Sequence, residues 1–198
     1  MISISTILIA LSTTIILVST AIYIISIVRG KAKPHRTTRV VILIIVTLSA
    51  TSLWANGDRV AFWLASSYVV ESLALFAFSI KYGMGGWSKT DITSSGVAIV
   101  GIVLWQVTEN PLVGLISSIV ADFAGTFPTI LKTYSQPRTE DWRFWALDTL
   151  ASILTLSAVT TYAFQDVVYP VYLIFADGIV ALLALGPRLN SLSHQKRK

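Results

Sequence analysis

ADFAGTFPTILKTYSQPRTEDW, residues 121–142, is the stretch around which the rest of the chain is organised. Asp122 places a carboxylate inside an apolar run, where an ionisable group is costly and usually functional. Gly125 and Pro128 follow it, and both residues weaken a helix. A polar loop comes next, with Lys132, Tyr134, Pro137, Thr139 and Glu140 as its distinctive residues. The stretch therefore predicts a membrane helix that ends in a structured turn.

The composition of the whole chain is typical of a membrane protein. Of the 198 residues, 54% are hydrophobic and only 13% are charged, whereas soluble domains carry about 25% charged residues. The chain has no cysteine, which excludes disulfides and cysteine-ligated metals. Its two histidines, His35 and His194, both lie in basic polar segments. We therefore expect no metal site and no cofactor.

Seven apolar segments predict an all-α integral membrane protein with seven transmembrane helices, because a helix needs about 20 residues to cross a bilayer. They cover residues 2–28, 40–55, 60–80, 92–108, 111–131, 144–164 and 167–186. The first segment lacks the basic start and cleavage site of a signal peptide, so we expect a retained helix. The prediction is a single domain, 1–187, followed by a basic cytoplasmic tail, 188–198, in a bacterial or archaeal cell membrane.

The loop charges predict the orientation of the helices. Residues 29–39 contain five Lys or Arg and no acid, and the C-terminal tail is also basic. Alternate loops carry more acid than base. Because basic loops stay in the cytoplasm, the N-terminus is predicted outside and the C-terminus inside. The net charge of +5 then needs no nucleic acid. The expected partners are the lipid bilayer and a small polar solute or protons, and a homo-oligomer remains open.

An internal repeat of about 51 residues divides the chain into helical hairpins. Basic residues end the odd-numbered helices, chain breakers follow five residues later, and good N-cap residues follow nine residues later. In that order the residues are Arg29, Lys81 and Lys132, then Pro34, Gly86 and Pro137, then Thr38, Thr90 and Asp141. Matched positions of this kind indicate a repeated unit. We predict hairpins at 2–56, 57–108 and 109–164 and a final helix at 167–186.

Acidic residues recur near the middle of these helices. Glu71, Asp122 and Asp177 are predicted at the bilayer midplane, where they suggest a shared polar centre for a substrate or protons. Further polar residues extend this lining. They are Ser118 and Thr126 on the helical face of Asp122, Asp148 nearer the cytoplasmic end of its own helix, and Ser12, Ser19, Tyr23 and Ser26 on one face of the first helix. The alternative is that these side chains form structural hydrogen bonds between helices.

The segment from Gly125 to Trp142 resembles the signature of the PQ-loop superfamily, in which a helix ends in Pro-Gln, a basic residue and an aromatic residue before a Ser/Thr-Glu turn. Pro128, Lys132, Tyr134, Thr139 and Glu140 occupy the matching places. The superfamily includes the SWEET and SemiSWEET sugar transporters and lysosomal amino-acid exporters. The resemblance implies a hinge at Pro128, and Gly125, which also loosens the helix, is predicted to be part of that hinge. The chain departs from the pattern at Thr129, which replaces glutamine, and at Ile25, where the first helix lacks a proline. The family repeat has three helices rather than two. The chain also resembles small uncharacterised multi-pass proteins of bacteria.

These features lead to one expected function and one alternative. We expect a secondary transporter or facilitator of a small polar solute, a sugar or an amino acid, with proton coupling through the midplane acids. The alternative is a receptor or assembly partner that transports nothing. We do not expect an enzyme, because Asp122 and Asp177 stand in the sequences ADFAG and ADGIV, which lack the Gly-x-Gly-Asp pattern of an intramembrane aspartyl protease. The last helix has no lysine for a retinal Schiff base.

Overall fold

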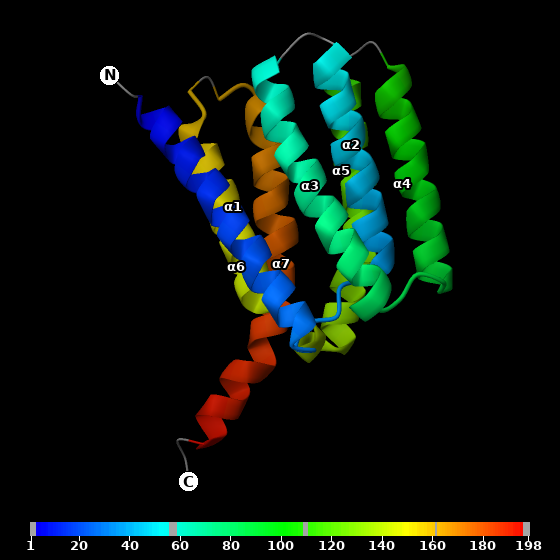
Figure 1. Ribbon diagram of the computed structural model, residues 1–198, viewed down its shortest axis with the longest axis vertical. Helices are drawn as coiled ribbons and strands as arrows, with labels where there is room; N and C mark the ends of the chain where they lie inside the picture. Colours follow the sequence, from blue (N-terminus) through cyan, green and yellow to red (C-terminus); the bar gives the residue numbers. More distant parts are fainter. Residues whose placement is uncertain (1–2, 56–58, 109–110, 161, 196–198) are drawn as a thin grey trace. The chain divides into compact units, whose positions relative to one another are not determined.

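The computed structural model describes residues 3–55, 59–108, 111–160 and 162–195. In this part the chain forms seven α-helices, one short 3-10 helix and no strand (Figure 1). The helices are α1 (Ile4–Val28), α2 (Arg36–Ala55), α3 (Arg59–Tyr82), α4 (Lys89–Val107), α5 (Pro111–Ser135), η1 (Pro137–Thr139), α6 (Trp142–Ala158) and α7 (Phe164–Gln195). Each of the seven apolar segments is thus helical, as predicted.

The ends of α6 and α7 differ from the prediction for local backbone reasons. α6 ends at Ala158 rather than near residue 164, because Val159 turns to an extended ψ of 132° and Tyr162 has a left-handed φ of 48°. α7 begins at Phe164 rather than at residue 167, and Pro170 lies inside it. α7 also continues through Pro187 to Gln195. Gly186 precedes that proline and has no Cβ to clash with its ring.

Two of the three predicted N-caps were also wrong. Asp141 does cap α6, and its side chain accepts a hydrogen bond from the backbone of Arg143. α4, however, is capped by Ser88 rather than Thr90, because Ser88 and Asp91 form a reciprocal capping box, which satisfies two backbone donors at once. Thr38 lies inside α2, which already begins at Arg36.

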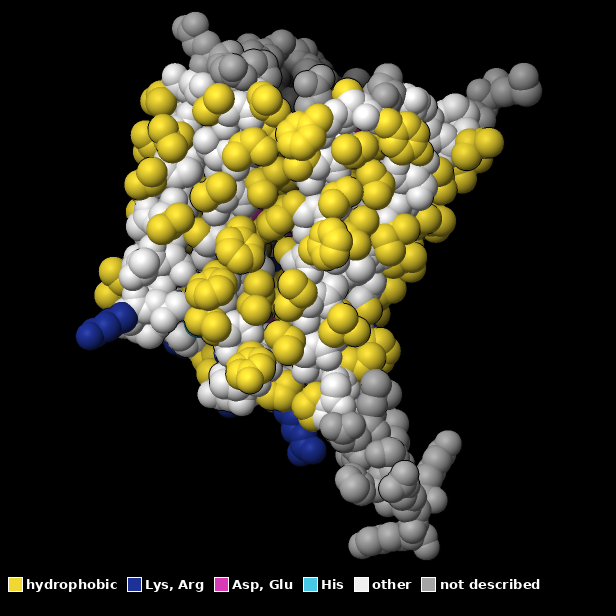
Figure 2. All heavy atoms as spheres, turned by 180° about the vertical axis from the view of Figure 1, so that it is seen from behind, with side chains coloured by type: hydrophobic (Ala, Val, Ile, Leu, Met, Phe, Trp, Pro, Cys, Tyr) yellow, Lys and Arg dark blue, Asp and Glu magenta, His cyan; other side chains and the backbone are white. Residues whose placement is uncertain are grey.

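Four of the helices are long and apolar enough to cross a membrane. They are α1, α4, residues Leu112–Ser135 of α5 and residues Asp166–Pro187 of α7. α5 has 25 residues and therefore spans about 37 Å, more than the hydrocarbon core of roughly 30 Å. Hydrophobic side chains cover the face shown in Figure 2, where the visible Lys and Arg side chains lie near one end of the helices. These properties are those of an integral membrane protein.

The chain divides into two compact units that do not follow the order of the sequence. Unit 1 contains Met1–Ala32 and Ile130–Lys198, and unit 2 contains Lys33–Thr129. Within unit 1, α6 packs against both α1 and α7; within unit 2, α2 packs against α3 and α4. The chain passes between the units twice, after Ala32 and inside α5 directly after Pro128 and Thr129. The turns predicted near 56–58 and 109–110 lie outside the described residues.

Small residues bring the helices of unit 2 close together. Its core consists of Val41, Ile45, Ala98, Ile102, Ala121 and Ala124. A Cβ atom added to Gly101 would lie 2.9 Å from the carbonyl oxygen of Ser117. A Cβ atom added to Gly125 would lie 2.5 Å from Cγ1 of Val41. Glycine at these two positions therefore allows α4 and α2, respectively, to approach α5 more closely than a larger residue would permit.

Candidate functional site

The central residue of the predicted site, Asp122, is buried in the middle of α5. Asp122 is only 8% exposed, and Thr126, one turn further along α5, is 4% exposed. Ser118, one turn before Asp122, is half-buried and donates a hydrogen bond of 2.8 Å to the carbonyl of Leu115 in its own helix. α5 therefore buries a carboxylate and a hydroxyl on one face of a candidate membrane span.

Pro128 interrupts α5 six residues after Asp122, at a point where a side chain of α2 hydrogen-bonds to α5. Pro128 has no N–H to donate to the carbonyl of Ala124, and its ring crowds that carbonyl. The hydroxyl of Thr38 donates a hydrogen bond of 2.6 Å to the next carbonyl, that of Gly125, and lies 2.8 Å from the hydroxyl of Thr129. Hydroxyl side chains commonly satisfy backbone groups beside a proline in membrane helices. Gly125 thus serves here as a close packing position against α2.

The other predicted acids are divided between the two units. Glu71 of α3 lies in unit 2 together with Asp122, whereas Asp177 of α7 and Asp148 of α6 lie in unit 1. Glu71, Asp148 and Asp177 are half-buried. A single centre that combines these carboxylates therefore stays a prediction.

Polar residues of α1 form a seam against α6 within unit 1. The hydroxyl of Ser12 donates to the carbonyl of Ala151 at 3.0 Å and lies 2.9 Å from the hydroxyl of Thr155. Two turns further along α1, Ser19 donates a hydrogen bond of 2.5 Å to Oδ1 of Asp148. The polar face predicted on the first helix therefore lies in a contact between helices, and Asp148 takes part in that contact.

The predicted motif loop contains a fully buried ion pair. Glu140 is 0% exposed, and its Oε1 accepts a hydrogen bond from the ammonium group of Lys132. Its Oε2 accepts hydrogen bonds from Tyr23 Oη at 2.8 Å and from Trp145 Nε1 at 3.0 Å. We call these four residues the Glu140 cluster. Both carboxylate oxygens have donors, which a buried ion pair needs to offset the loss of water.

The turn after α5 explains how Lys132 and Glu140 meet. Lys132 lies in the last turn of α5, and η1 begins at Pro137. The tight η1 turn brings Glu140 back toward the end of α5. Tyr134, also part of the predicted motif, is 76% exposed and lies outside the cluster.

Sequence reasoning missed the role of two members of the Glu140 cluster. Tyr23 was predicted only as part of a polar face, and its ring in fact stacks on Phe144 with centroids 4.2 Å apart. Trp145 carried no signal in the sequence, because a tryptophan in an apolar segment is equally consistent with packing. Only the fold shows that its ring N–H reaches Glu140.

Asp141 follows the cluster and is held as a carboxylate. Its oxygens accept hydrogen bonds from Nε of Arg143 at 3.0 Å and from Nη2 at 2.7 Å. Burial raises the pKa of Asp141, but the hydrogen bonds and the charge of Arg143 outweigh burial, so that the pKa lies below its usual value. Asp141 therefore remains ionised at neutral pH, which suits its position at the N-terminus of α6.

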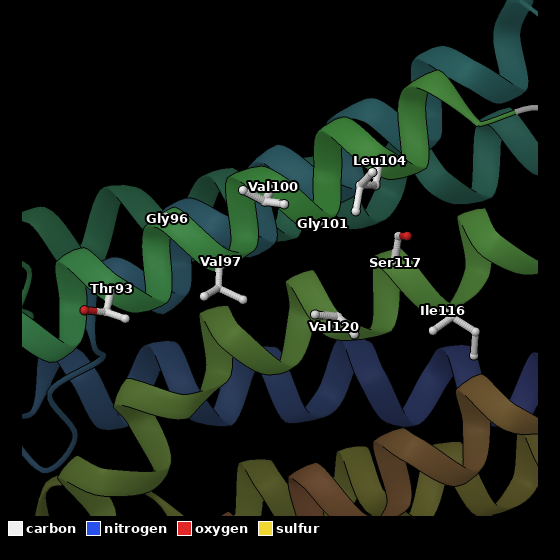
Figure 3. A pocket seen from close by; sticks show the side chains of 9 residues that line it. All are labelled: Thr93, Gly96, Val97, Val100, Gly101, Leu104, Ile116, Ser117 and Val120. Atoms are coloured by element: carbon white, nitrogen blue, oxygen red, sulfur yellow. The ribbon is translucent and has the colours of Figure 1, made fainter.

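An apolar groove of about 470 Å³ lies between α4 and α5 in unit 2 (Figure 3). Val97, Val100 and Leu104 of α4 and Ile116 and Val120 of α5 line most of it. Such a lining suits hydrocarbon rather than a polar solute, so we do not place a solute there. Within the described ranges, no group of three or more metal-ligating side chains comes together.

Comparison of the chain with protein-family models, with curated proteins and with solved structures gives no match. The resemblance to the PQ-loop superfamily therefore rests on the short motif alone.

Proposed function

We propose that all seven helices cross a cell membrane, with the N-terminus outside, and that the protein is a secondary transporter or facilitator of a small polar solute. The solute class is a sugar or an amino acid, and a proton moves with it. Asp122 carries the proton, assisted by Glu71 and Asp177, and Thr126 and Ser118 contribute hydroxyl groups to the same path.

The observation that carries this proposal is the burial of Asp122. It is 8% exposed and lies halfway along a helix that is apolar enough to cross a membrane. Removing an ionised carboxylate from water is unfavourable, so such a group binds a proton, hydrogen-bonds to protein groups, or faces a cation or a polar substrate. A carboxylate that changes its protonation state during a cycle can couple proton movement to solute movement.

The division of the chain into two units supports the same proposal. Transporters change access to a central site when one bundle of helices rocks against another. Here the chain crosses from unit 2 to unit 1 within α5, one residue after Pro128. A proline at this crossing makes the helix easier to bend, which fits the hinge that the PQ-loop resemblance implies.

The second candidate function is a receptor or assembly partner without transport. The hydrogen bond from Ser19 to Asp148 favours it, because that acid joins two helices. If Asp122 joins helices in the same way, an amide would replace it with little loss, since an amide also accepts hydrogen bonds. A proton-coupling role, by contrast, requires a group that titrates.

The two functions can be separated by proton flux into proteoliposomes. We would impose a pH gradient, add sugars and amino acids singly, and compare the wild type with Asp122→Asn. We expect flux that depends on one solute class and is reduced at least tenfold in Asp122→Asn, while the melting temperature of the variant stays close to that of the wild type.

The matched control is Asp166→Asn, which removes an acid from the first turn of α7 rather than from the middle of a helix. Its flux should equal that of the wild type. Solute-dependent flux that survives in Asp122→Asn would contradict the proposed proton carrier. A wild type without flux, together with a markedly lower melting temperature for Asp122→Asn, would favour the receptor or assembly role.

A further inference from the structure

The loop between α3 and α4 is held rigidly by one buried carboxylate. Asp91 is 2% exposed, and its Oδ2 accepts hydrogen bonds from the backbone N–H of Gly86 and of Ser88, both at 2.9 Å. The hydroxyl of Ser88 donates to the same oxygen at 2.8 Å. On the other side, Oδ1 accepts from Thr37 at 3.1 Å and lies 3.3 Å from Nε2 of His35.

Backbone contacts with the start of α2 fix the same loop from a second direction. Met84 donates to the carbonyl of Pro34 at 3.0 Å, and Arg36 donates to the carbonyl of Met84 at 3.0 Å. The Arg36 guanidinium donates to the carbonyls of Ser79, Ile80 and Gly85. These bonds satisfy the end of α3, where free carbonyls attract a cation.

Trp87 stands between the two residues that Asp91 holds, and it is 89% exposed. A large apolar side chain that is fully exposed on a rigid loop loses contact with water only if something outside the chain covers it. The exposed side chains of Lys81, in the last turn of α3, and Lys89, the first residue of α4, lie six and two residues from it in the sequence. Residues 81–91 contain one acid, Asp91, and it is buried.

The position of Trp87 relative to the membrane indicates what covers it. α4 is one of the helices that can cross a membrane, and it begins at Lys89. Trp87 therefore precedes a candidate membrane span by two residues, and tryptophan is favoured at the level of the lipid headgroups where such spans begin. Lysines at this level attract anionic headgroups.

We propose that Trp87, Lys81 and Lys89 form a docking site for an anionic phospholipid of the adjacent leaflet. The indole ring enters the interface between headgroups and acyl chains, and the two ammonium groups bind the lipid phosphate. The rigid Asp91 loop fixes the depth of the ring, so that the bound lipid sets the position of the α3–α4 connection in the membrane. This proposal requires insertion in a membrane but is independent of transport.

The depth of residue 87 can be measured directly because the chain has no cysteine. A nitroxide attached to Trp87→Cys, in the full chain reconstituted into vesicles, should be relaxed more by oxygen than by a water-soluble nickel chelate. The same label on Lys31→Cys, an exposed residue of the basic α1–α2 loop, should show the reverse order. Equal, water-like accessibility at both positions would overturn the proposal.

The lipid preference is tested by thermal unfolding of the detergent-solubilised chain titrated with short-chain phosphatidylglycerol. Short-chain phosphatidylcholine and inorganic phosphate serve as comparisons for the uncharged lipid and the free anion. Phosphatidylglycerol should stabilise the wild type at the lowest concentration, and phosphate should not stabilise it. Lys81→Gln and Lys89→Gln should each raise the half-maximal phosphatidylglycerol concentration about fivefold. Trp87→Ala should weaken the effect of both lipids.

The control variant combines Tyr134→Ala, an exposed aromatic residue in the last turn of α5, with Arg138→Gln, an exposed base in η1. Its response to phosphatidylglycerol should equal that of the wild type. A lipid site at Trp87 would be contradicted if this control lost as much stabilisation by phosphatidylglycerol as the lysine variants do. It would also be contradicted if phosphate stabilised the wild type as well as phosphatidylglycerol does, or if Trp87→Ala responded to the lipids like the wild type. Because each midpoint is read against the variant's own lipid-free baseline, a general loss of stability does not imitate the result.

Discussion

At the scale of single residues, Glu140 shows what allows a charge to be buried. The Tyr23 hydroxyl, the Trp145 ring N–H and the Lys132 ammonium group donate hydrogen bonds to its carboxylate. Each oxygen therefore has a donor in place of the water that it loses. Attraction within a buried pair and the cost of removing both charges from water nearly cancel. The pair therefore contributes little net stability as a pair, whereas the loss of one partner is expensive.

This asymmetry gives the first prediction. Glu140→Ala leaves the Lys132 ammonium group buried without its carboxylate, and it removes the acceptor of Tyr23 and Trp145. We expect the free energy of unfolding to fall by about 3–5 kcal/mol. Thermal or denaturant unfolding in a mild detergent would measure the change.

A double variant and a surface variant are the controls for this prediction. Lys132→Met combined with Glu140→Leu removes both charges and should recover part of the lost stability, because Tyr23 and Trp145 still lack their acceptor. Arg143→Ala removes a half-exposed partner of Asp141 and should cost less than about 1 kcal/mol. If the double variant is no more stable than Glu140→Ala, the charge left behind is not the cause.

Asp141 gives a prediction of pH dependence. Its pKa is lower in the folded chain than its ordinary value of 3.8, so its carboxylate contributes stability above that value. The contribution disappears as pH falls through the lower, folded pKa. Unfolding between pH 6 and pH 2 should show a loss of stability below about pH 4, and Asp141→Asn should lack this component. An identical pH profile in the variant would refute the assignment.

At the scale of helices, close packing decides which glycines tolerate a side chain. A Cβ atom on Gly125 would meet Cγ1 and Cβ of Val41 at 2.5 and 2.7 Å, whereas a Cβ atom on Gly96 would have no neighbour within 4 Å. Gly125→Ala should therefore lower the free energy of unfolding by about 1–3 kcal/mol. Gly96→Ala should leave it unchanged or raise it by about 0.5–1 kcal/mol. Unfolding midpoints of the two variants provide the measurement.

The second-site control for this prediction is Val41→Ala. Combined with Gly125→Ala it should recover part of the loss, because it removes Cγ1, the atom nearest to the new methyl group, although the Cβ at 2.7 Å remains. An unchanged stability for Gly125→Ala alone would mean that α2 and α5 separate easily, contrary to tight packing in the core of unit 2.

The helices themselves were predictable because apolar runs of this length have few alternatives. Their ends were less so, since they depend on single backbone choices such as the extended Val159 and the pairing of Gly186 with Pro187. The motif loop was found from its spacing, but the partners of Glu140 were not. Lys132 meets Glu140 because η1 returns the chain. Tyr23 meets Glu140 because α1 packs against α6 despite the more than 100 residues between them in the sequence. Contacts of this range leave no local trace in a single sequence.

At the scale of the whole molecule, α5 is the helix that belongs to both units. On the unit 2 side, Thr38 holds the carbonyl of Gly125 and contacts Thr129. On the unit 1 side, Glu140 holds Lys132. Both attachments lie within about one helical turn of Pro128. We therefore expect any bend that Pro128 introduces in α5 to lie between Gly125 and Lys132, the residues that these contacts hold.

This confinement predicts the effect of Pro128→Ala. Alanine restores an N–H for the carbonyl of Ala124, so the helix becomes continuous through the junction. Amide hydrogen exchange in residues 129–133 should slow, with the melting temperature unchanged or raised. If the protein transports as proposed, the maximal rate should fall while the half-saturating solute concentration changes little, because bending rather than binding is impaired.

Pro187→Ala, at the far end of α7, should change amide exchange only near its own position. Slower exchange at 129–133 without a change in rate would separate the bend in α5 from the transport step, and unchanged exchange would show that Pro128 does not loosen the junction.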